Sequence, residues 1–136
     1  MDRIRYRAGC KYQLAETYSA ETVVCSDEKI ETDFIDLDKE GLLTIRAGYA
    51  WDGPSGPTFD TKSFMRGSLV HDALYQLMRG GHLPSSCRED ADQELHRICR
   101  EDGMNRFRAW YVLLGVRKGA GFAAAPKAKK QIRSAP

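Results

Sequence analysis

Hydrophobic and polar residues alternate along parts of the first 46 positions of this chain. The segments 12–19 (YQLAETYS) and 30–37 (IETDFIDL) partly alternate, which is typical of strands with one face toward water. A turn at 39–41 (KEG) precedes another strand at 42–45 (LLTI). We therefore expect residues 3–46 to form antiparallel β-hairpins or a sheet. The acidic residues between 27 and 40 fit the solvated side of these strands, and a calcium or partner site is the alternative.

Residues 47–62 (AGYAWDGPSGPTFDTK) interrupt this pattern. Glycine and proline are too dense there for a long helix or a long strand. The segment also carries Tyr49, Trp51 and Phe59, whose rings would anchor it to a core. We therefore expect an ordered loop, and ordered loops often carry functional residues.

Apolar residues at helical spacing predict three helices after this loop. The first is capped by Ser63 and ends at about Arg79, before two glycines. The second begins with a capping box of Ser86 and Glu89 and ends at about Glu101.

Asn105 caps the third predicted helix, and a segment of small and basic residues follows it. The whole pattern predicts the α+β class, with antiparallel strands followed by a three-helix unit. We expect a single domain over 1–118 with a β layer (3–46), an ordered loop (47–62) and helices (63–118), followed by a basic arm or tail (119–136).

The net charge of +2 combines two unequal parts. From Arg117 to the end there are six basic residues and no acidic ones. Removing these six from the 21 basic residues leaves 15 against 19 acidic residues, a net charge of −4 for the rest of the chain. We therefore expect no specific nucleic-acid binding by the body. The basic arm could lie on an acidic neighbouring subunit or on an anionic membrane.

The first residues (MDRIRYRAGCKYQL) are charged and carry no apolar signal core, and no window has the apolar length of a membrane span. The four cysteines, at positions 10, 25, 87 and 99, form no CxxC pair, which argues against a zinc ribbon. We expect free thiols in a reducing cytosol, and the alternative is disulfide bridges formed later, within or between subunits, if the protein leaves the cell. Cys87 or Cys99 as a nucleophile paired with a histidine has no supporting pattern.

Three residues of the first two predicted helices could form a catalytic group. His71 and Tyr75 are at i and i+4, so they share a helix face. Asp92 falls on the apolar stripe of the next helix, where a carboxylate needs a buried partner. If the helices are antiparallel, Asp92 can meet His71, fix its tautomer and leave its other nitrogen to take a proton from water. The alternative is a purely structural bond between two helices.

Asp72 follows His71 directly, so its side chain is turned by about 100° around the axis of the predicted helix, toward a neighbouring flank of that helix. Together with backbone carbonyls of the glycine-rich loop it could form an oxygen cage for Ca²⁺. The alternative is an ordinary turn in which Asp52 or Asp60 caps locally. A metal phosphohydrolase of the HD type would need another histidine before His71, and the sequence has none.

The motifs Trp51-x-Gly53-x-x-Gly-Pro, His71-Asp72-x-x-Tyr75 and Ala-Asp92 resemble the calcium loop and His–Asp helix pair of secreted phospholipase A2, especially its short bacterial and fungal type. The resemblance spans about 45 residues. It implies Ca²⁺ held at Trp51, Gly53 and Asp72, with His71 as general base oriented by Asp92 and Tyr75. The sequence departs from that family in lacking its helix-flanking cysteines and in its N-terminal β region.

A second resemblance covers roughly residues 40–116. The segments GYAWDGPSGP (48–57), LVHDALY (69–75) and REDAD (88–92) are similar to a family of short uncharacterised phage and prophage proteins. This resemblance implies a phage setting, with a role in the virion or in infection. Because the N-terminus shows no signal core, we expect a protein made in the cytoplasm of a bacterial host without a signal peptide and incorporated in a virion.

Two functions follow as expectations. The first is a virion-associated hydrolase that cleaves phospholipid acyl esters with calcium and a phospholipase A2-like site. The second is a non-enzymatic tail or baseplate component, in which the His–Asp pair is structural and the basic arm binds neighbouring virion proteins.

Overall fold

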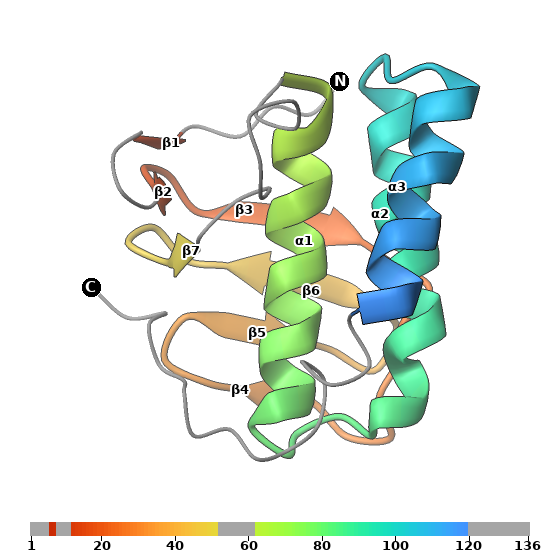
Figure 1. The fold of residues 1–136 in the computed structure, drawn as a ribbon. Helices are drawn as coiled ribbons and strands as arrows, with labels where there is room; N and C mark the ends of the chain where they lie inside the picture. The colour runs from red at the N-terminus through yellow and green to blue at the C-terminus, as the bar shows by residue number, and fades with distance from the viewer. Residues whose placement is uncertain (1–5, 8–11, 52–61, 120–136) are drawn as a thin grey trace. The chain divides into compact units, whose positions relative to one another are not determined.

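The computed structural model describes residues 6–7, 12–51 and 62–119. The strands and the helices belong to two compact units, which are treated separately below. Antiparallel strands come first in the chain and helices follow, so the predicted α+β class is confirmed (Figure 1). The single domain expected over 1–118 stays a prediction, and so does the arm, which lies outside the described residues after 119.

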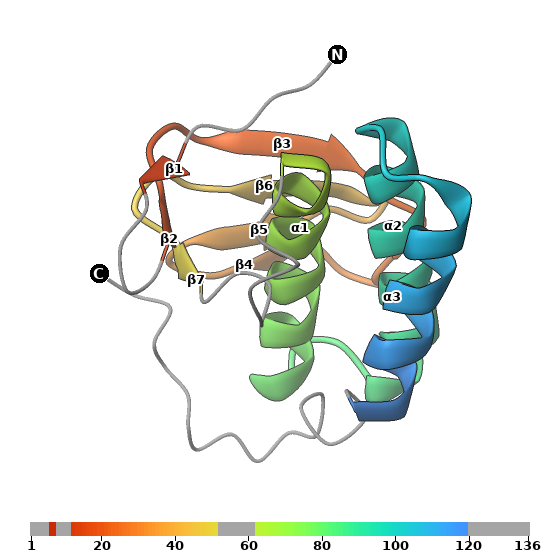
Figure 2. The ribbon, with the colours of Figure 1, turned by 45° about the horizontal axis from the view of Figure 1, so that its top comes forward.

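The strand unit contains two antiparallel sheets. One has the order β1-β2-β7, and the other has the order β3-β6-β5-β4 (Figure 2). Their bounds are β1 Tyr6–Arg7, β2 Tyr12–Leu14, β3 Tyr18–Glu21, β4 Ile30–Glu31, β5 Ile35–Leu37, β6 Leu42–Ile45 and β7 Ala50–Trp51.

Buried and more exposed residues alternate along β5 and β6, and the buried ones form the inner face of the larger sheet. Ile35 pairs with Ile45 and Leu37 pairs with Leu43, and all four side chains are buried. The pattern at 12–19 is less regular than predicted, because residues 15–17 leave the strand and separate β2 from β3. The expected turn at 39–41 is present between β5 and β6.

This turn requires its glycine. Gly41 has a φ of 98°, and a Cβ built on it would lie 2.3 Å from the carbonyl oxygen of Thr22. The Thr22 amide donates to the Gly41 carbonyl at 2.9 Å. A side chain at position 41 would therefore clash with the backbone at Thr22 and separate the turn from that segment.

The predicted loop 47–62 is described only as far as Trp51. Within that part, β7 pairs with β2, so Trp51 lies opposite Tyr12 with ring centroids 5.6 Å apart. Tyr49 and Trp51 are buried, as expected for anchoring rings. Residues 52–61, including Phe59, lie outside the described part of the chain.

The helical unit contains α1 (Lys62–Arg79), a short 3-10 turn η1 (Ser85–Cys87), α2 (Arg88–Glu101) and α3 (Arg106–Gly119). After α1, the Gly81 amide donates to Met78 and the His82 amide donates to Leu77, with Gly81 at a φ of 81°. This arrangement is a Schellman motif, and it confirms the predicted helix end at the two glycines.

The capping predictions had mixed outcomes. The cap predicted at Ser63 is wrong, because α1 already begins at Lys62 and Ser63 lies inside the helix. Asn105 caps α3 as predicted, because its Oδ1 accepts from the Arg108 amide at 2.8 Å. The prediction of a capping box of Ser86 and Glu89 is wrong. Cys87 occupies the N-cap position of α2, and its side chain makes no capping hydrogen bond. The 3-10 turn at 85–87 already places residue 86 in helical backbone, which moves the start of α2 past the serine.

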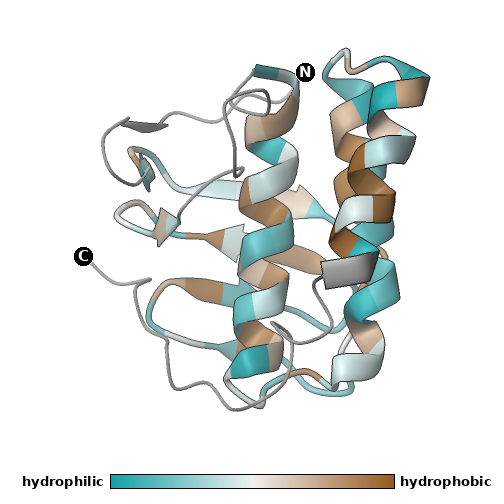
Figure 3. Cartoon of the chain, in the orientation of Figure 1, coloured by the Kyte–Doolittle hydropathy of each residue, from teal (hydrophilic) through white to brown (hydrophobic). Residues whose placement is uncertain are grey.

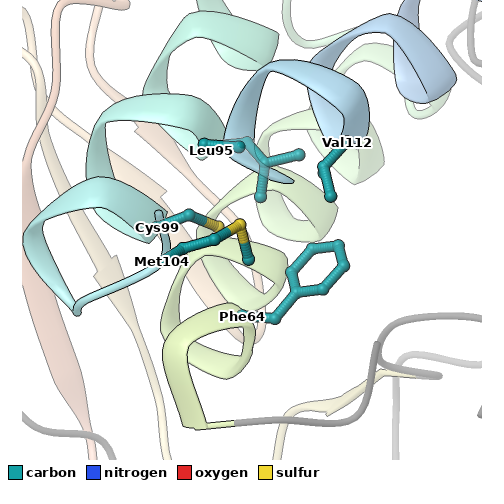
Figure 4. Packing of buried hydrophobic residues seen from close by; sticks show 6 residues of the cluster. Phe64, Leu95, Cys99, Met104 and Val112 are labelled. Carbon is teal, nitrogen blue, oxygen red and sulfur yellow. The ribbon is translucent and has the colours of Figure 1, made fainter. Parts of the chain in front are cut away.

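Helix α2 packs against both α1 and α3, and a core cluster fills the space among the three helices. Figure 4 shows Phe64 of α1 with its ring directed toward Val112 and Leu95, and Cys99 and Met104 complete the cluster. Gly67 permits this close packing, since a Cβ there would lie 3.0 Å from both Cys99 Sγ and Leu95 Cδ1. In the part of the chain that is described, no helix is long and apolar enough to cross a membrane.

Candidate active site

Helices α1 and α2 run antiparallel, and this direction decides which polar residues meet. Arg66, near the start of α1, bonds Asp102, at the end of α2. His71 and Tyr75, further along α1, bond Asp92, which lies near the start of α2. The expected antiparallel pairing of the His–Asp helices is therefore present.

Asp92 accepts hydrogen bonds from both residues of α1 through the same oxygen atom. His71 Nε2 lies 2.7 Å from Asp92 Oδ1, and Tyr75 Oη donates to that oxygen at 2.7 Å. The two rings are one helical turn apart, with centroids separated by 4.2 Å and planes tilted by 34°. The side chains of His71, Tyr75 and Asp92 therefore meet, as the sequence predicts.

The carboxyl group of Asp92 is buried, with 1% of its side chain exposed. Its other oxygen, Oδ2, makes no hydrogen bond to any described residue. An unpaired buried acceptor costs on the order of 1–3 kcal/mol. The two hydrogen bonds at Oδ1 therefore offset only part of the free-energy cost of burying this carboxylate. Losing either of them would lower the stability of the folded state.

Tyr75 is a permanent donor in this group. Burial raises the pKa of its hydroxyl, and the hydrogen bond to Asp92 and the charge of Asp92 raise that pKa further. Tyr75 therefore keeps its proton throughout the physiological range. It fixes the position of Asp92 without taking part in proton transfer.

His71 is the member of the group that reaches solvent, because 14% of its side chain is exposed. A carboxylate oxygen accepts hydrogen bonds, so Nε2 carries the proton in the bond to Asp92. Nδ1 is then left with a lone pair and makes no hydrogen bond to a described residue. A histidine held in this tautomer, with one nitrogen open, can take a proton from a water molecule.

Positive charge lies near this group. The charges of Arg88 and Arg117 both act to lower the pKa of Tyr75, against the larger effect of burial, so both guanidinium groups lie in its neighbourhood. Arg117 of α3 is 3.6 Å from Glu89, and its buried Nε and Nη2 make no hydrogen bond within the described ranges. This arginine therefore brings a positive charge, paired through Nη2 with Glu89, and no sequence pattern had marked it.

The predicted calcium ligands fall in different parts of the chain. Asp72 is half-buried on α1, Trp51 belongs to the strand unit, and Gly53 lies outside the described part of the chain. No group of three or more His, Cys, Asp or Glu residues in the described ranges could hold a metal ion. Calcium at Trp51, Gly53 and Asp72 stays a prediction.

Cys99, one of the two cysteines considered as an alternative nucleophile, is not suited to that role. The three cysteines in the described ranges form no disulfide bond; they are Cys25, Cys87 and Cys99. Burial raises the pKa of the Cys99 thiol to about 12, so it is protonated and inert at neutral pH.

Sequence reasoning missed a second charged group at the other end of α1. Arg66 is 6% exposed and bonds Asp102 through Nε and Nη2, and it also bonds Glu101 at 2.6 Å. An arginine within an apolar stripe, opposite two consecutive acids at the end of the neighbouring helix, was the available signal. This group fixes the register of α1 against α2, and that register places Asp92 beside His71.

Comparisons with protein-family models, with curated proteins and with solved structures found no match to this chain.

Proposed function

We propose that this chain is a hydrolase of phospholipid acyl esters, in which His71 activates water and Asp92 and Tyr75 orient His71. The observation that carries the proposal is the hydrogen-bonded group of these three residues. Its histidine has one nitrogen bonded to a buried carboxylate, and its ring is partly exposed. Such a group provides a base with a fixed tautomer, as general base catalysis requires.

Each residue has a defined part in the proposed reaction. Nδ1 of His71 takes a proton from water as the water oxygen bonds to the acyl carbon. Asp92 stabilises the imidazolium that forms. The ester C–O bond then breaks and the proton passes from His71 to the departing alkoxide, so that one water molecule is consumed and a fatty acid and an alcohol are released.

A positive group near the substrate is also required, because negative charge develops on the carbonyl oxygen and phospholipids carry phosphate. Arg117, which forms an ion pair with Glu89 at 3.6 Å, carries a positive charge of the kind that suits an anionic ligand. Calcium, when bound as the resemblance to phospholipase A2 implies, would supply further charge at the carbonyl. Asp72 is the described side chain in its predicted ligand set.

We place this activity on a phage or prophage protein, incorporated in the virion and in contact with other virion proteins. This setting rests on the resemblance at 48–57, 69–75 and 88–92. The second candidate function is a tail or baseplate component without activity. It is supported by the burial of Asp92 and Tyr75 between two helices, which also suits a purely structural connection.

Release of fatty acid from phosphatidylglycerol and phosphatidylcholine vesicles tests the proposal, in calcium and in EDTA. We expect wild type to release fatty acid and His71→Ala to lose that activity. His82→Ala is the matched control, because His82 is exposed after α1 and its side chain makes no hydrogen bond to the site among the described residues. If wild type is folded and inactive on both lipids in both conditions, the hydrolase proposal fails and the structural function stands.

A further inference from the structure

Helix α3 exposes a row of large apolar side chains. Phe107, Trp110, Tyr111 and Leu114 are 73%, 51%, 59% and 41% exposed. Their spacing of three, four and seven residues puts them within one face about 100° wide. The rings of Phe107 and Trp110 contact each other, with centroids 6.0 Å apart. We call these four residues the α3 aromatic surface.

The same helix buries its opposite face. Ala109 and Val112 belong to the core cluster, and Val116 packs against that cluster. Helix α3 is therefore apolar on two opposite sides, and Figure 3 shows hydrophobic colour over its middle turns. The core requires only one of these sides. Large apolar groups exposed together are a usual mark of a binding surface.

Basic residues border the α3 aromatic surface. Arg106 and Arg108 flank it on either side, at about 100° from Phe107 around the helix axis. An open hollow of about 750 Å³ adjoins it and is lined by His96, Arg100, Arg106, Phe107 and Trp110. Arg106 makes no ion pair within the described ranges. From residue 103 to the end, the sequence has eight basic residues and no acidic one.

We infer that the α3 aromatic surface docks on an anionic lipid bilayer, with lipid phosphate groups in the hollow beside Arg100 and Arg106. Tryptophan and tyrosine are favoured at the boundary between headgroups and acyl chains, and flanking arginines attract acidic headgroups. A second copy of this chain fits less well, because apposed α3 surfaces would bring arginines of the same charge together. The inference deepens the proposed function, which already names lipid as partner, by naming the surface that meets it.

Flotation of the full chain with vesicles tests this inference without any need for hydrolysis. The probes are vesicles of phosphatidylcholine alone and of phosphatidylcholine with phosphatidylglycerol. We expect binding to the anionic vesicles, weakened by salt. Phe107→Ser with Trp110→Ser should lower the partition coefficient by at least about tenfold, since both rings lose contact with lipid. His71→Ala should bind like wild type, so failure of the hydrolase proposal would leave this result intact.

Matched variants distinguish binding through the α3 aromatic surface from general effects of lost apolar area or changed charge. Val23→Ser with Leu42→Ser removes two exposed apolar residues from the strand unit and should leave binding unchanged. Arg106→Glu should weaken binding more than Lys39→Glu, which makes the same change of charge in the β5–β6 turn. Equal binding by wild type and the Phe107/Trp110 variant overturns the inference. So does a wild-type dimer in solution that this variant converts to monomer.

Discussion

His71 Nε2 and Asp92 Oδ1 lie 2.7 Å apart, although 21 positions separate the two residues in sequence. The contact is possible because α1 and α2 are antiparallel and because Gly67 lets them approach closely one turn before His71. Arg66 then fixes the register by bonding Glu101 and Asp102. The candidate active site therefore depends on the packing of two helices rather than on a local motif.

Tyr75→Phe should destabilise the protein. The substitution removes one of the two donors to Asp92 Oδ1 and leaves the buried carboxylate with His71 alone. We expect the free energy of unfolding to fall by about 1.5–3 kcal/mol, the range for hydrogen bonds to charged groups. Urea denaturation measures it. Tyr111→Phe is the control and should change stability by less than about 0.5 kcal/mol, because Tyr111 is exposed on α3.

Gly67→Ala should also destabilise the protein, although alanine is the better helix former by about 0.5–1 kcal/mol. The new methyl group would lie 3.0 Å from Leu95 Cδ1 and Cys99 Sγ, which belong to buried side chains, and 3.3 Å from the backbone oxygen of Leu95. Overpacking of this kind costs about 1–3 kcal/mol, so the net change should be a loss.

The control for this substitution is Gly115→Ala in α3, where nothing lies within 4 Å of the added Cβ. It should raise thermal stability through helix propensity alone. If Gly67→Ala stabilises the protein as much as Gly115→Ala does, the close approach of α1 and α2 at this point is disproved.

Stability should fall in acid partly through Glu101. Its hydrogen bond from Arg66 holds the pKa of this carboxyl below the usual value of 4.5. A carboxyl whose folded pKa is depressed stabilises the folded state fully above its unfolded pKa. That contribution is lost as pH falls through the folded pKa.

Unfolding free energies measured from about pH 6 to about pH 2 should therefore depend less steeply on pH in Glu101→Gln than in wild type. Glu40→Gln removes an exposed carboxyl in a turn and should retain the wild-type slope. Identical pH profiles for wild type and Glu101→Gln would contradict the role given to the Arg66 group.

Thiol reactivity should separate two of the cysteines. Cys25 is exposed, whereas burial raises the pKa of Cys99 to about 12. Alkylation with iodoacetamide at neutral pH, read by peptide mass spectrometry, should modify Cys25 and leave Cys99 unmodified until the protein unfolds. Rapid native modification of Cys99 would show that the helical core opens far more readily than its packing implies.

The parts of the structure that were predictable from sequence are those set by local rules. The C-terminal end of α1 before two glycines and the start of α3 after Asn105 follow from backbone and capping chemistry. Asp92 was identifiable because a carboxylate on an apolar stripe needs a partner within reach.

Features that depend on tertiary contacts were missed or misplaced. Ser86 lost its capping role to a 3-10 turn whose presence no local pattern indicated. Arg66 and Arg117 were not identified, because their significance depends on which residues of neighbouring helices face them. The outer aromatic residues of α3 were indistinguishable in sequence from a core-facing stripe, since α3 is apolar on both sides.

The central claim is that Asp92 holds His71 as the base of a hydrolase, and the rate of fatty acid release by Asp92→Asn compared with wild type tests it most directly. The amide would keep the shape of the site but favour the wrong tautomer of His71, so we expect the rate to fall by about 10²- to 10⁴-fold. Circular dichroism of the variant should remain that of a folded protein. A folded Asp92→Asn protein that hydrolyses phospholipid at the wild-type rate would contradict the claim, and so would a wild-type protein that releases no fatty acid.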